Sequence, residues 1–457
     1  MVAARKAWPF ARRSGAPCAY AALIAGAFMA AGVPARATAS PAPPAPLSPA
    51  EAWVHFDRDH ISATGASGFA DAKSGRAVTI DDPVRVASVS KLVVALGVMR
   101  LVEQGKLGLD TDVSHYLGWT LRNPAHPDSR ITLAMLLSHT SSLQDDGEAY
   151  IIRLGDTMAG KLSLTCGGKA VPHIERIIHP SNFISYRMTG SFAGCTARSP
   201  AMWNQSGNLP GSYFRYANIN FGLVGTIIER VTKQRFDQAM DALVIQPLAL
   251  KACFNWGGRC TGADAARAVT LYRPDGTEAL DDLGGALPAC PVYVKAGEDC
   301  DLSGYLPDTN GALFSPQGGL RISPRELAKI GQMLGADGRD AQGQVFLTPA
   351  SIAQMRAPRW TYDGQNGDTE QGFYCAYGLA TQIMGLATHP ACRDRLPGME
   401  GRWYGHAGDA YSLKSGLWVE TKSGKGMAYY TTAVANETPK DGPSAFTAAE
   451  QRMAAKR

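Results

Sequence analysis

The two ends of the chain carry strand-like patterning, and the stretch between them carries helical patterning. Segments rich in β-branched and aromatic residues, or alternating apolar and polar positions, lie between glycine-containing turns at both ends. The predicted strands are Ala52–Phe56, Ile61–Phe69, Ala77–Ile80, Ser415–Glu420 and Met427–Val434. The last two flank a polar, glycine-containing hairpin turn at 421–426. We therefore expect one sheet built from both ends of the chain.

The middle of the chain, from Ser88 to about Ala249, has apolar residues at helical spacing. The predicted helical segments are Leu92–Val102, Ile131–Leu137, Ile219–Val231 and Phe236–Leu248. Leu92–Val102 is apolar on nearly every side, which is typical of a helix in the protein interior.

Two further helices are expected after this middle stretch. Ser323-Pro324-Arg325-Glu326 places a serine at the N-cap, a proline at the first helical position and a glutamate at the third, which predicts a helix over Leu327–Leu334. A closing helix is expected from Ser444 onward.

Together these elements predict an α/β (α+β) fold, in which an antiparallel sheet from both chain ends is flanked by helices and carries an inserted, mainly helical lobe. We expect one domain over residues 51–440. Its sheet lobe comprises about 51–87 and 310–457, and its helical lobe about 88–309. Weakly periodic stretches at 144–210 and 253–307 are predicted to be loop-rich insertions at the surface.

Residues 1–39 have the features of an export signal. The basic start is followed by an apolar run at 18–33 and by a small-x-small cleavage site within 35–39, and a proline-rich linker follows at 40–50. The basic residues are Arg5, Lys6, Arg12 and Arg13. The run is short for a stable membrane span, so an uncleaved anchor is the lesser alternative; the Arg pair leaves twin-arginine export open beside the general route. We expect a periplasmic or secreted bacterial protein with no stable membrane span after signal cleavage.

Composition narrows the class of partner. The 457 residues are 45% hydrophobic and 19% charged, which is typical of a globular protein with an ample core. The net charge of +5 is spread along the chain without a dense basic run, so nucleic acid is not an expected partner. A small-molecule or peptide ligand is expected instead.

The cysteines indicate disulfide bonds. Removing Cys18 with the signal leaves an even set with no C-x-x-C pair, so a zinc or redox site is not expected. In an exported protein, disulfides are favoured over free buried thiols. Pairing of sequence neighbours joins Cys166 with Cys195, Cys253 with Cys260, Cys290 with Cys300, and Cys375 with Cys392. Other connectivities remain open.

Ser88-Val89-Ser90-Lys91 is the first candidate for chemistry. The residues Ser88 and Lys91 are three apart at the start of the predicted interior helix, so they share a helix face and the amine can take the proton of the hydroxyl. That makes Ser88 a candidate nucleophile. The alternative is that Ser88 is a plain N-cap.

A second candidate is the triplet Tyr216-Ala217-Asn218, which precedes a predicted helix. A tyrosine hydroxyl beside a lysine ammonium is expected to lose its proton more readily, which makes Tyr216 a candidate acid/base partner for a serine. An asparagine two residues later can orient the lysine and a substrate carbonyl. A buried tyrosine tethered to the backbone is the competing interpretation.

A third candidate is His406-Ala407-Gly408 on a predicted strand. Small residues there let a ligand lie against the strand edge, and a backbone N–H can bind an oxyanion. Two K-S-G triplets, beginning at Lys414 and Lys422, compete for the same role. Lys422 lies in the hairpin turn and Lys414 directly before a strand, so His406 is preferred.

Taken in chain order, Ser88-x-x-Lys91, Tyr216-x-Asn218 and His406-x-Gly408 resemble the serine β-lactamase and penicillin-binding-protein superfamily, in its class C-like branch. The phrases at 101–107, 131–141 and 318–323 match as well, and the resemblance covers about 53–436. It implies acyl transfer without a metal or organic cofactor. In the roles that it implies, Lys91 and Tyr216 act as base and acid. Asn218 and His406 position the substrate and tune Tyr216. The backbone N–H groups of Ser88 and Asp409 form the oxyanion hole.

This chain departs from the family pattern in places. Ser142 stands where the family usually has glycine, which puts that loop's conformation in question, and His139 beside it is expected to be structural. No Ser-Asp-Asn triplet occurs, which argues against a separate glutamate base, and no G-x-S-x-G supports a different serine-hydrolase class. The histidine in the third box resembles D-aminopeptidases, D-alanyl-D-alanine carboxypeptidases and some esterases more than β-lactamases.

The expected function is therefore that of an exported serine hydrolase that forms an acyl-enzyme on Ser88. D-amino-acid peptides are the preferred substrate class, as for a D-aminopeptidase or D,D-carboxypeptidase. A short-chain esterase is the main alternative. A β-lactamase and a non-catalytic cell-wall peptide sensor are further alternatives.

Overall fold

The computed structural model describes residues 48–145, 207–292, 300–435 and 442–456, with short stretches at 157–158, 164–166, 169–170, 195–197 and 202–204. The chain divides into two compact units, 1–45 and 46–457, and every described residue belongs to the second. The predicted export signal, most of the linker and most of the 144–210 insertion lie outside the described residues. In the part of the chain that is described, no helix is long and apolar enough to cross a membrane.

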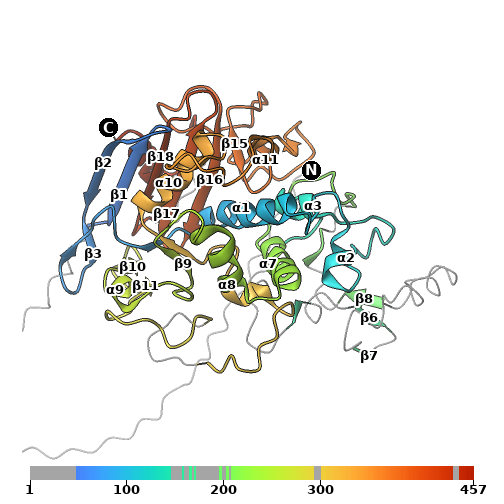
Figure 1. Cartoon of the computed structure of the whole chain (residues 1–457). Helices are drawn as coiled ribbons and strands as arrows, with labels where there is room; N and C mark the ends of the chain where they lie inside the picture. Colours follow the sequence, from blue (N-terminus) through green and yellow to red (C-terminus); the bar gives the residue numbers. More distant parts are fainter. Residues whose placement is uncertain are drawn as a thin grey trace, which may run out of the picture. The chain divides into compact units, whose positions relative to one another are not determined.

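The core of the fold is an eight-stranded antiparallel sheet in the order β13-β14-β15-β16-β17-β18-β1-β2 (Figure 1). Its strands are β1 (Glu51–Phe56), β2 (Ile61–Ser67), β13 (Trp360–Thr361), β14 (Ala376–Tyr377), β15 (Gln382–Met384), β16 (Trp403–Ala410), β17 (Leu413–Glu420) and β18 (Gly426–Thr431). Strand β1 pairs with β18 from Glu51 opposite Thr431 to Phe56 opposite Gly426. The two ends of the chain thus meet in one sheet, which confirms the prediction.

The remaining elements are short strands and helices. The helices are α1 (Val89–Glu103), α2 (Val113–Leu117), α3 (Leu133–Leu137), α7 (Ile219–Thr232), α8 (Phe236–Met240), α9 (Gly262–Ala265), α10 (Pro324–Gly335), α11 (Pro349–Arg356) and α12 (Ala448–Ala454), with a π-helix η2 (Asp241–Ile245) and a 3-10 helix η3 (Gly311–Phe314). The small sheets are β3 (Phe69–Asp71) with β4 (Arg76–Ala77), β5 (Val84–Arg85) with β12 (Leu320–Ile322) and β9 (Ala252–Phe254), β10 (Leu271–Tyr272) with β11 (Glu278–Leu280), and β6 (Leu164–Cys166) with β7 (Lys169–Ala170) and β8 (Cys195–Ala197).

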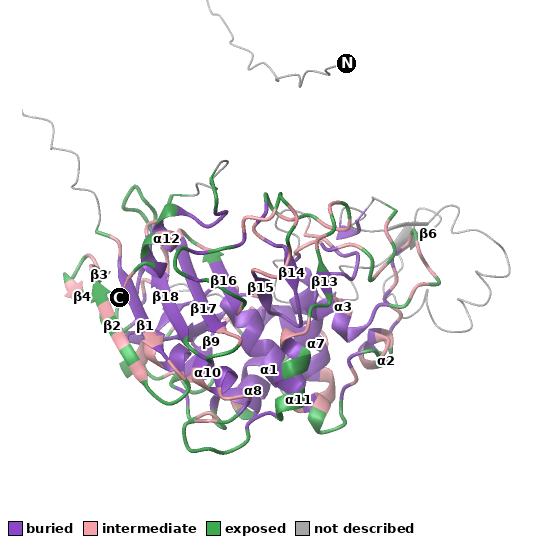
Figure 2. Ribbon diagram, turned by 90° about the horizontal axis from the view of Figure 1, so that it is seen from above, coloured by how far each residue is buried: buried purple, intermediate pink, exposed green. Residues whose placement is uncertain are grey.

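Helices cover both faces of the large sheet because its inner strands are apolar on both sides. Along β17, Leu417 belongs to the main core with α1 and α10, whereas its neighbour Trp418 belongs to a second core with α12. Figure 2 shows the buried strands between α12 on one side and α1 and α10 on the other. Helix α1 is buried on nearly its whole circumference, as predicted, and it contacts β16 and β17.

Most local predictions are confirmed and two are corrected. The Ser323 hydroxyl caps α10 by accepting a hydrogen bond from the N–H of Glu326. The helix predicted over Phe236–Leu248 is regular only to Met240 and continues as a π-helix, because Pro247 closes the segment soon afterwards. The strand predicted over Ala77–Ile80 is wrong beyond Ala77, because the Asp82 carboxylate accepts a hydrogen bond from the Thr79 N–H in a turn.

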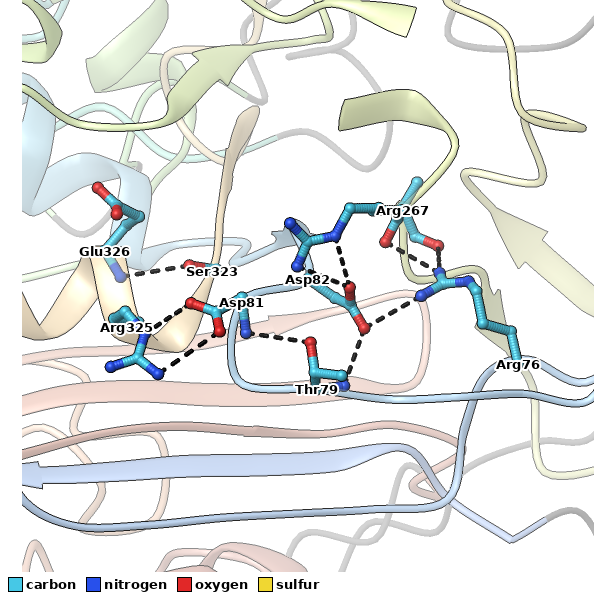
Figure 3. A network of polar contacts seen from close by, with 9 residues as sticks. Arg76, Thr79, Asp81, Asp82, Arg267, Ser323, Arg325 and Glu326 are labelled. Atoms are coloured by element: carbon cyan, nitrogen blue, oxygen red, sulfur yellow. Dashed lines mark hydrogen bonds and ion pairs between the residues drawn. The ribbon is translucent and has the colours of Figure 1, made fainter. Parts of the chain in front are cut away.

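That turn belongs to a polar network that anchors the segment leading to Ser88 (Figure 3). Asp82 is 1% exposed, and its carboxylate accepts hydrogen bonds from Thr79 N, Arg76 and Arg267 at 2.8, 3.1 and 3.2 Å. Asp81, its neighbour, pairs instead with Arg325 of α10 at 2.6 Å on the surface. The segment from this turn continues through β5 directly into the first candidate site.

Three of the four predicted disulfides are present: Cys253–Cys260, Cys290–Cys300 and Cys375–Cys392. Cys166 and Cys195 lie opposite each other where β6 pairs with β8, but their side chains are outside the described part of the structure. The fourth bond therefore stays a prediction. Two of these disulfides lie in the described part of the 253–307 insertion, which also contains α9, β10 and β11.

Replacing Asp82 with alanine should destabilise the fold by about 2 kcal/mol or more, because a buried carboxylate with several charge-assisted bonds is lost. The neighbouring change Asp81→Ala removes only a surface ion pair and should cost less than about 1 kcal/mol. Urea unfolding of both variants measures the difference. Equal costs for the two variants would show that the Asp82 hydrogen bonds drawn in Figure 3 do not stabilise the turn more than the Asp81 ion pair does.

Candidate active site

Ser88 lies at a sharp turn between β5 and α1. Ala87, just before it, has a left-handed backbone with φ 46°, a conformation that alanine adopts only under constraint. The Ser90 hydroxyl donates to the carbonyl of Ala87 at 2.6 Å and accepts from the N–H of Leu320 at 3.0 Å, so this neighbouring serine holds the turn against β12. Ser88 occupies the N-cap position of α1, but its side chain makes no capping hydrogen bond. The plain N-cap interpretation therefore fails.

The Lys91 amine lies within hydrogen-bond distance of three oxygens. Its Nζ is 2.9 Å from Ser88 Oγ, 2.8 Å from Asn218 Oδ1 and 2.8 Å from the carbonyl oxygen of Gln317. The last two can only accept, so a neutral amine donates its two protons to them and directs its lone pair at the Ser88 hydroxyl. The three contacts thus aim the amine at Ser88 in the direction that proton removal requires.

Burial lowers the pKa of Lys91 from 10.5 to about 7. The side chain is 0% exposed, and nearby Arg85 lowers its pKa further, whereas the carboxylates of Asp145 and Glu370 raise it. A substantial fraction of the amine is therefore neutral near pH 7, as a general base must be.

The amide of Asn218 is oriented by Asp145, a residue that the sequence did not single out. One carboxylate oxygen accepts from Asn218 Nδ2 at 2.9 Å and from its backbone N at 2.8 Å, and the other accepts from Ile219 N at 3.0 Å. Asp145 therefore caps α7 and fixes which end of the amide faces Lys91. An aspartate far from the triplet in sequence gave no signal of this role.

Tyr216 packs over the lysine, with its ring centre 4.9 Å from Lys91 Nζ. Its hydroxyl is buried and makes no hydrogen bond of normal geometry within the described residues. Burial raises its pKa well above 10, although the side chains of Ser88 and Tyr374 offset part of that rise. The expectation that the neighbouring lysine makes Tyr216 more acidic is not met, because burial outweighs it; the phenol stays protonated.

His406 lies behind Tyr216 and does not line the cavity at Ser88. It is 0% exposed, its Nδ1 is 2.5 Å from the carbonyl of Ala407, and its Nε2 is 2.7 Å from the hydroxyl of Tyr377. Burial and the Lys91 charge lower its pKa to about 3, which keeps it neutral. Its position suits the predicted tuning of Tyr216 better than direct contact with substrate.

One residue of the loop after α3, His139, packs against the same tyrosine, and a second, Ser142, shapes that loop. His139 is 1% exposed, its ring lies 4.3 Å from that of Tyr216, and its Nδ1 is 3.2 Å from the N–H of Ala217. Ser142 adopts φ 67°, a left-handed conformation that glycine adopts without strain, and Asn123 Nδ2 donates to its hydroxyl at 3.1 Å. The serine thus keeps the glycine-like turn by adding a hydrogen bond.

Gly408 and Asp409 lie on the part of β16 that borders the cavity. Strand β15 pairs with β16 only as far as Gly405, so within the described sheet the following residues have a strand partner, β17, on one side only. A Cβ on Gly408 would lie 2.4 Å from the carbonyl of Val86 and 2.2 Å from Ser415 Oγ. Glycine here allows β16 to approach the turn before Ser88, in addition to bordering the ligand space.

These groups meet in one cavity of about 1090 Å³. Ser88, Tyr216 and Asn218 line it together with Gly408 and Asp409, so all the sequence-predicted residues except Lys91 and His406 reach its wall. Sequence reasoning missed Asp368, Glu370 and Tyr374, which contribute to another side of the wall and come from the segment between β13 and β14.

This fold, with a serine, a buried lysine and a tyrosine meeting at the start of α1, is that of acyl-transferring serine enzymes. The model of the β-lactamase family matches residues 50–450, and the chain belongs to that family. By name, relatives and structural neighbours include an esterase, a D-amino acid amidase and a hydrolase with promiscuous acyltransferase activity.

One curated relative and two solved structures illustrate the kinds of protein that this chain resembles. The esterase EstB of Burkholderia gladioli is 30% identical over 189 residues, which are 41% of this chain and 42% of the esterase; the chain thus spans less than two thirds of that relative. The octameric penicillin-binding protein homologue from Pyrococcus abyssi superposes with a TM-score of 0.55 at 18% identity, covering 89% of this chain and 72% of that one. The D-amino acid amidase from Ochrobactrum anthropi gives 0.53 at 15% identity, covering 85% and 89%.

Gly408→Ala should destabilise the protein by about 1–3 kcal/mol, because the added methyl group forces β16 away from the turn before Ser88. Urea unfolding gives the value. Gly262→Ala is the matched control, since a Cβ there meets no atom within 4 Å, and it should be nearly neutral. A neutral Gly408→Ala would mean that the approach of β16 to Val86 is not required.

Proposed function

We propose that the protein is a serine hydrolase that cleaves amide or ester bonds through an acyl-enzyme on Ser88. The observation that carries this proposal is the Lys91 amine, held by two carbonyl acceptors and 2.9 Å from the Ser88 hydroxyl. Its lowered pKa of about 7 supplies a neutral base.

In the acylation step, Lys91 takes the Ser88 proton as the oxygen attacks the substrate carbonyl. The negative charge that forms on the carbonyl oxygen is stabilised by the N–H groups of Ser88 and Asp409. The Ser88 N–H donates to no group in the described part of the chain, which leaves it available for this role.

Tyr216 is the proposed acid. Its phenol is protonated and lines the same cavity as Ser88, so it can give a proton to the departing nitrogen or oxygen and recover one from Lys91. A water molecule then attacks the acyl-enzyme, with Tyr216 and Lys91 again acting as the base that takes its proton. Lys91 passes a proton to the Ser88 oxygen as the bond between that oxygen and the acyl carbon breaks. Asn218 orients Lys91, and His406 positions Tyr216 through the surrounding aromatic side chains.

The proposed substrates are peptides or amides of D-amino acids, as for a D-aminopeptidase or D,D-carboxypeptidase, acted on in the periplasm or outside the cell. A protonated acid beside the nucleophile supports them, because an amine leaves only when it is protonated. A short-chain esterase is the second candidate, favoured by the similarity to esterase EstB. Hydrolysis of β-lactams and binding without turnover are the remaining outcomes.

A fluorophosphonate should add to wild-type protein and not to Ser88→Ala, as measured by intact mass. Ser90→Ala is the matched control and should still be labelled, because Ser90 contacts backbone rather than Lys91. Turnover of a D-alanyl anilide, a D-alanyl-D-alanine peptide, 4-nitrophenyl butyrate and a chromogenic cephalosporin then identifies the substrate class. Equal labelling of wild type and Ser88→Ala would refute the proposed nucleophile.

For a neutral ester, kcat/KM should rise as the pH increases through about 7 and then level off, because only the neutral form of Lys91 removes a proton. Measuring kcat/KM in a series of buffers from roughly pH 5 to roughly pH 9 tests this dependence. A rate that falls over the same interval would exclude Lys91 as the base.

Tyr216→Phe should slow anilide hydrolysis about 100-fold or more, and slow 4-nitrophenyl ester hydrolysis far less, since nitrophenolate leaves without a proton. Comparing kcat for the two substrates isolates the effect. Equal losses on both would assign Tyr216 a structural role.

A further inference from the structure

The segment between β13 and β14 carries polar side chains into the cavity and is firmly attached to the site. The N–H of Phe214 donates to the carbonyl of Asn366 at 3.0 Å, and the N–H of Asp368 donates to the carbonyl of Phe214 at 2.9 Å. Phe214 lies two residues before Tyr216. The segment therefore keeps a defined position relative to the proposed acid.

Within this segment, Glu370 and Gln371 both have left-handed backbones, with φ 46° and 62°. The carbonyl of Gln371 accepts from Arg393 at 2.8 and 3.1 Å, and the Cys375–Cys392 disulfide joins the same two parts of the chain. Neighbouring structure thus holds a conformation that these residues do not favour on their own. The consequence is that the Glu370 side chain lines the cavity.

The Glu370 carboxylate has no hydrogen bond or ion pair within the described residues, and the residue is exposed at the cavity mouth. Its charge reaches the centre of the site, since it raises the pKa values of Lys91, Tyr216 and Tyr374. A carboxylate that lines the same cavity as Ser88 and has no partner among the described residues is available to a ligand.

The surrounding charges indicate which ligand. Loss of water and the carboxylates of Asp368 and Asp409 raise the pKa of Glu370 to about 7, while Arg215 and Lys91 lower it. Asp409 is already paired with Lys414 at 2.5 Å. A bound cation would relieve the mutual repulsion of the carboxylates, whereas a bound anion would add to it.

We propose that Glu370 binds a free ammonium group of the substrate, so that the enzyme prefers amino-acid amides and peptides with an unblocked amine. This inference rests on the proposed acyl transfer at Ser88 and selects the aminopeptidase type over the carboxypeptidase type. The buried Tyr216 hydroxyl, unpartnered within the described residues, faces the same space and marks it as a place built to receive polar substrate atoms.

The test compares a cationic substrate with its neutral analogue: D-alanine 4-nitroanilide and N-acetyl-D-alanine 4-nitroanilide. D-alaninamide and N-acetyl-D-alaninamide serve in parallel as inhibitors of 4-nitrophenyl butyrate hydrolysis. The variants are Glu370→Gln, which removes the charge, and Glu370→Asp, which keeps it. Glu400→Gln, an exposed glutamate away from the cavity, is the matched control.

Wild type should favour the cationic member of each pair, and Glu370→Gln should reduce that preference about tenfold, while Glu370→Asp retains most of it and Glu400→Gln all of it. An unchanged ratio in Glu370→Gln, or a wild type that favours neither member or the acetylated one, overturns the inference. Fluorophosphonate labelling of each variant separates the two proposals: a wild type without a Ser88 adduct refutes the acyl-transfer function itself, whereas a labelled enzyme with an unchanged ratio refutes only the role of Glu370.

Discussion

The structure of the site depends on placing one lysine amine where water cannot reach it. Moving the pKa of Lys91 from 10.5 to about 7 disfavours the charged form by about 5 kcal/mol, so the surrounding fold must hold a group that would otherwise be hydrated. Two oxygens that can only accept, from Gln317 and Asn218, then decide which way the amine points. Burial creates the base, and the acceptors aim it.

Each acceptor is held by a separate buried network. Asp145 fixes the Asn218 amide. Close to Gln317 in the chain, Arg321 of β12 is 0% exposed and donates to both carboxylate oxygens of Asp281 at 2.9 and 3.1 Å. Its Nη1 also donates to the carbonyl of Gly319 at 2.8 Å. Gly319 lies two residues from Gln317, and Asp281 belongs to the 253–307 insertion. That insertion therefore supports the backbone beside the active site and is more than a surface loop.

The sequence predicted the sheet from both chain ends, the interior helix α1 and three disulfides, because periodicity, capping and cysteine spacing are local signals. It also named Ser88, Lys91, Tyr216 and Asn218, which the fold brings together. It could not find Asp145, which acts through hydrogen bonds to residues far away in the chain, or Glu370, which only the fold brings to the same cavity as Ser88. It also misjudged the sign of the effect on Tyr216, because the depth of burial is a property of the folded structure alone.

Burial lowers the pKa of Lys91 and raises the pKa of Tyr216, and it thereby gives the two groups different roles in the proposed reaction. Burial favours the neutral form of every group, which for an amine means the base and for a phenol means the acid. Burial thus produces an acid/base pair, and among the described residues neither group forms an ion pair. The Glu370 carboxylate at the cavity mouth, which has no partner among the described residues, opposes this effect by raising the pKa of Lys91. A cationic substrate that neutralised the Glu370 charge would lower the Lys91 pKa again as the substrate bound. Binding of the substrate's positive charge and the fraction of neutral Lys91 are then coupled through the electrostatic effect of Glu370.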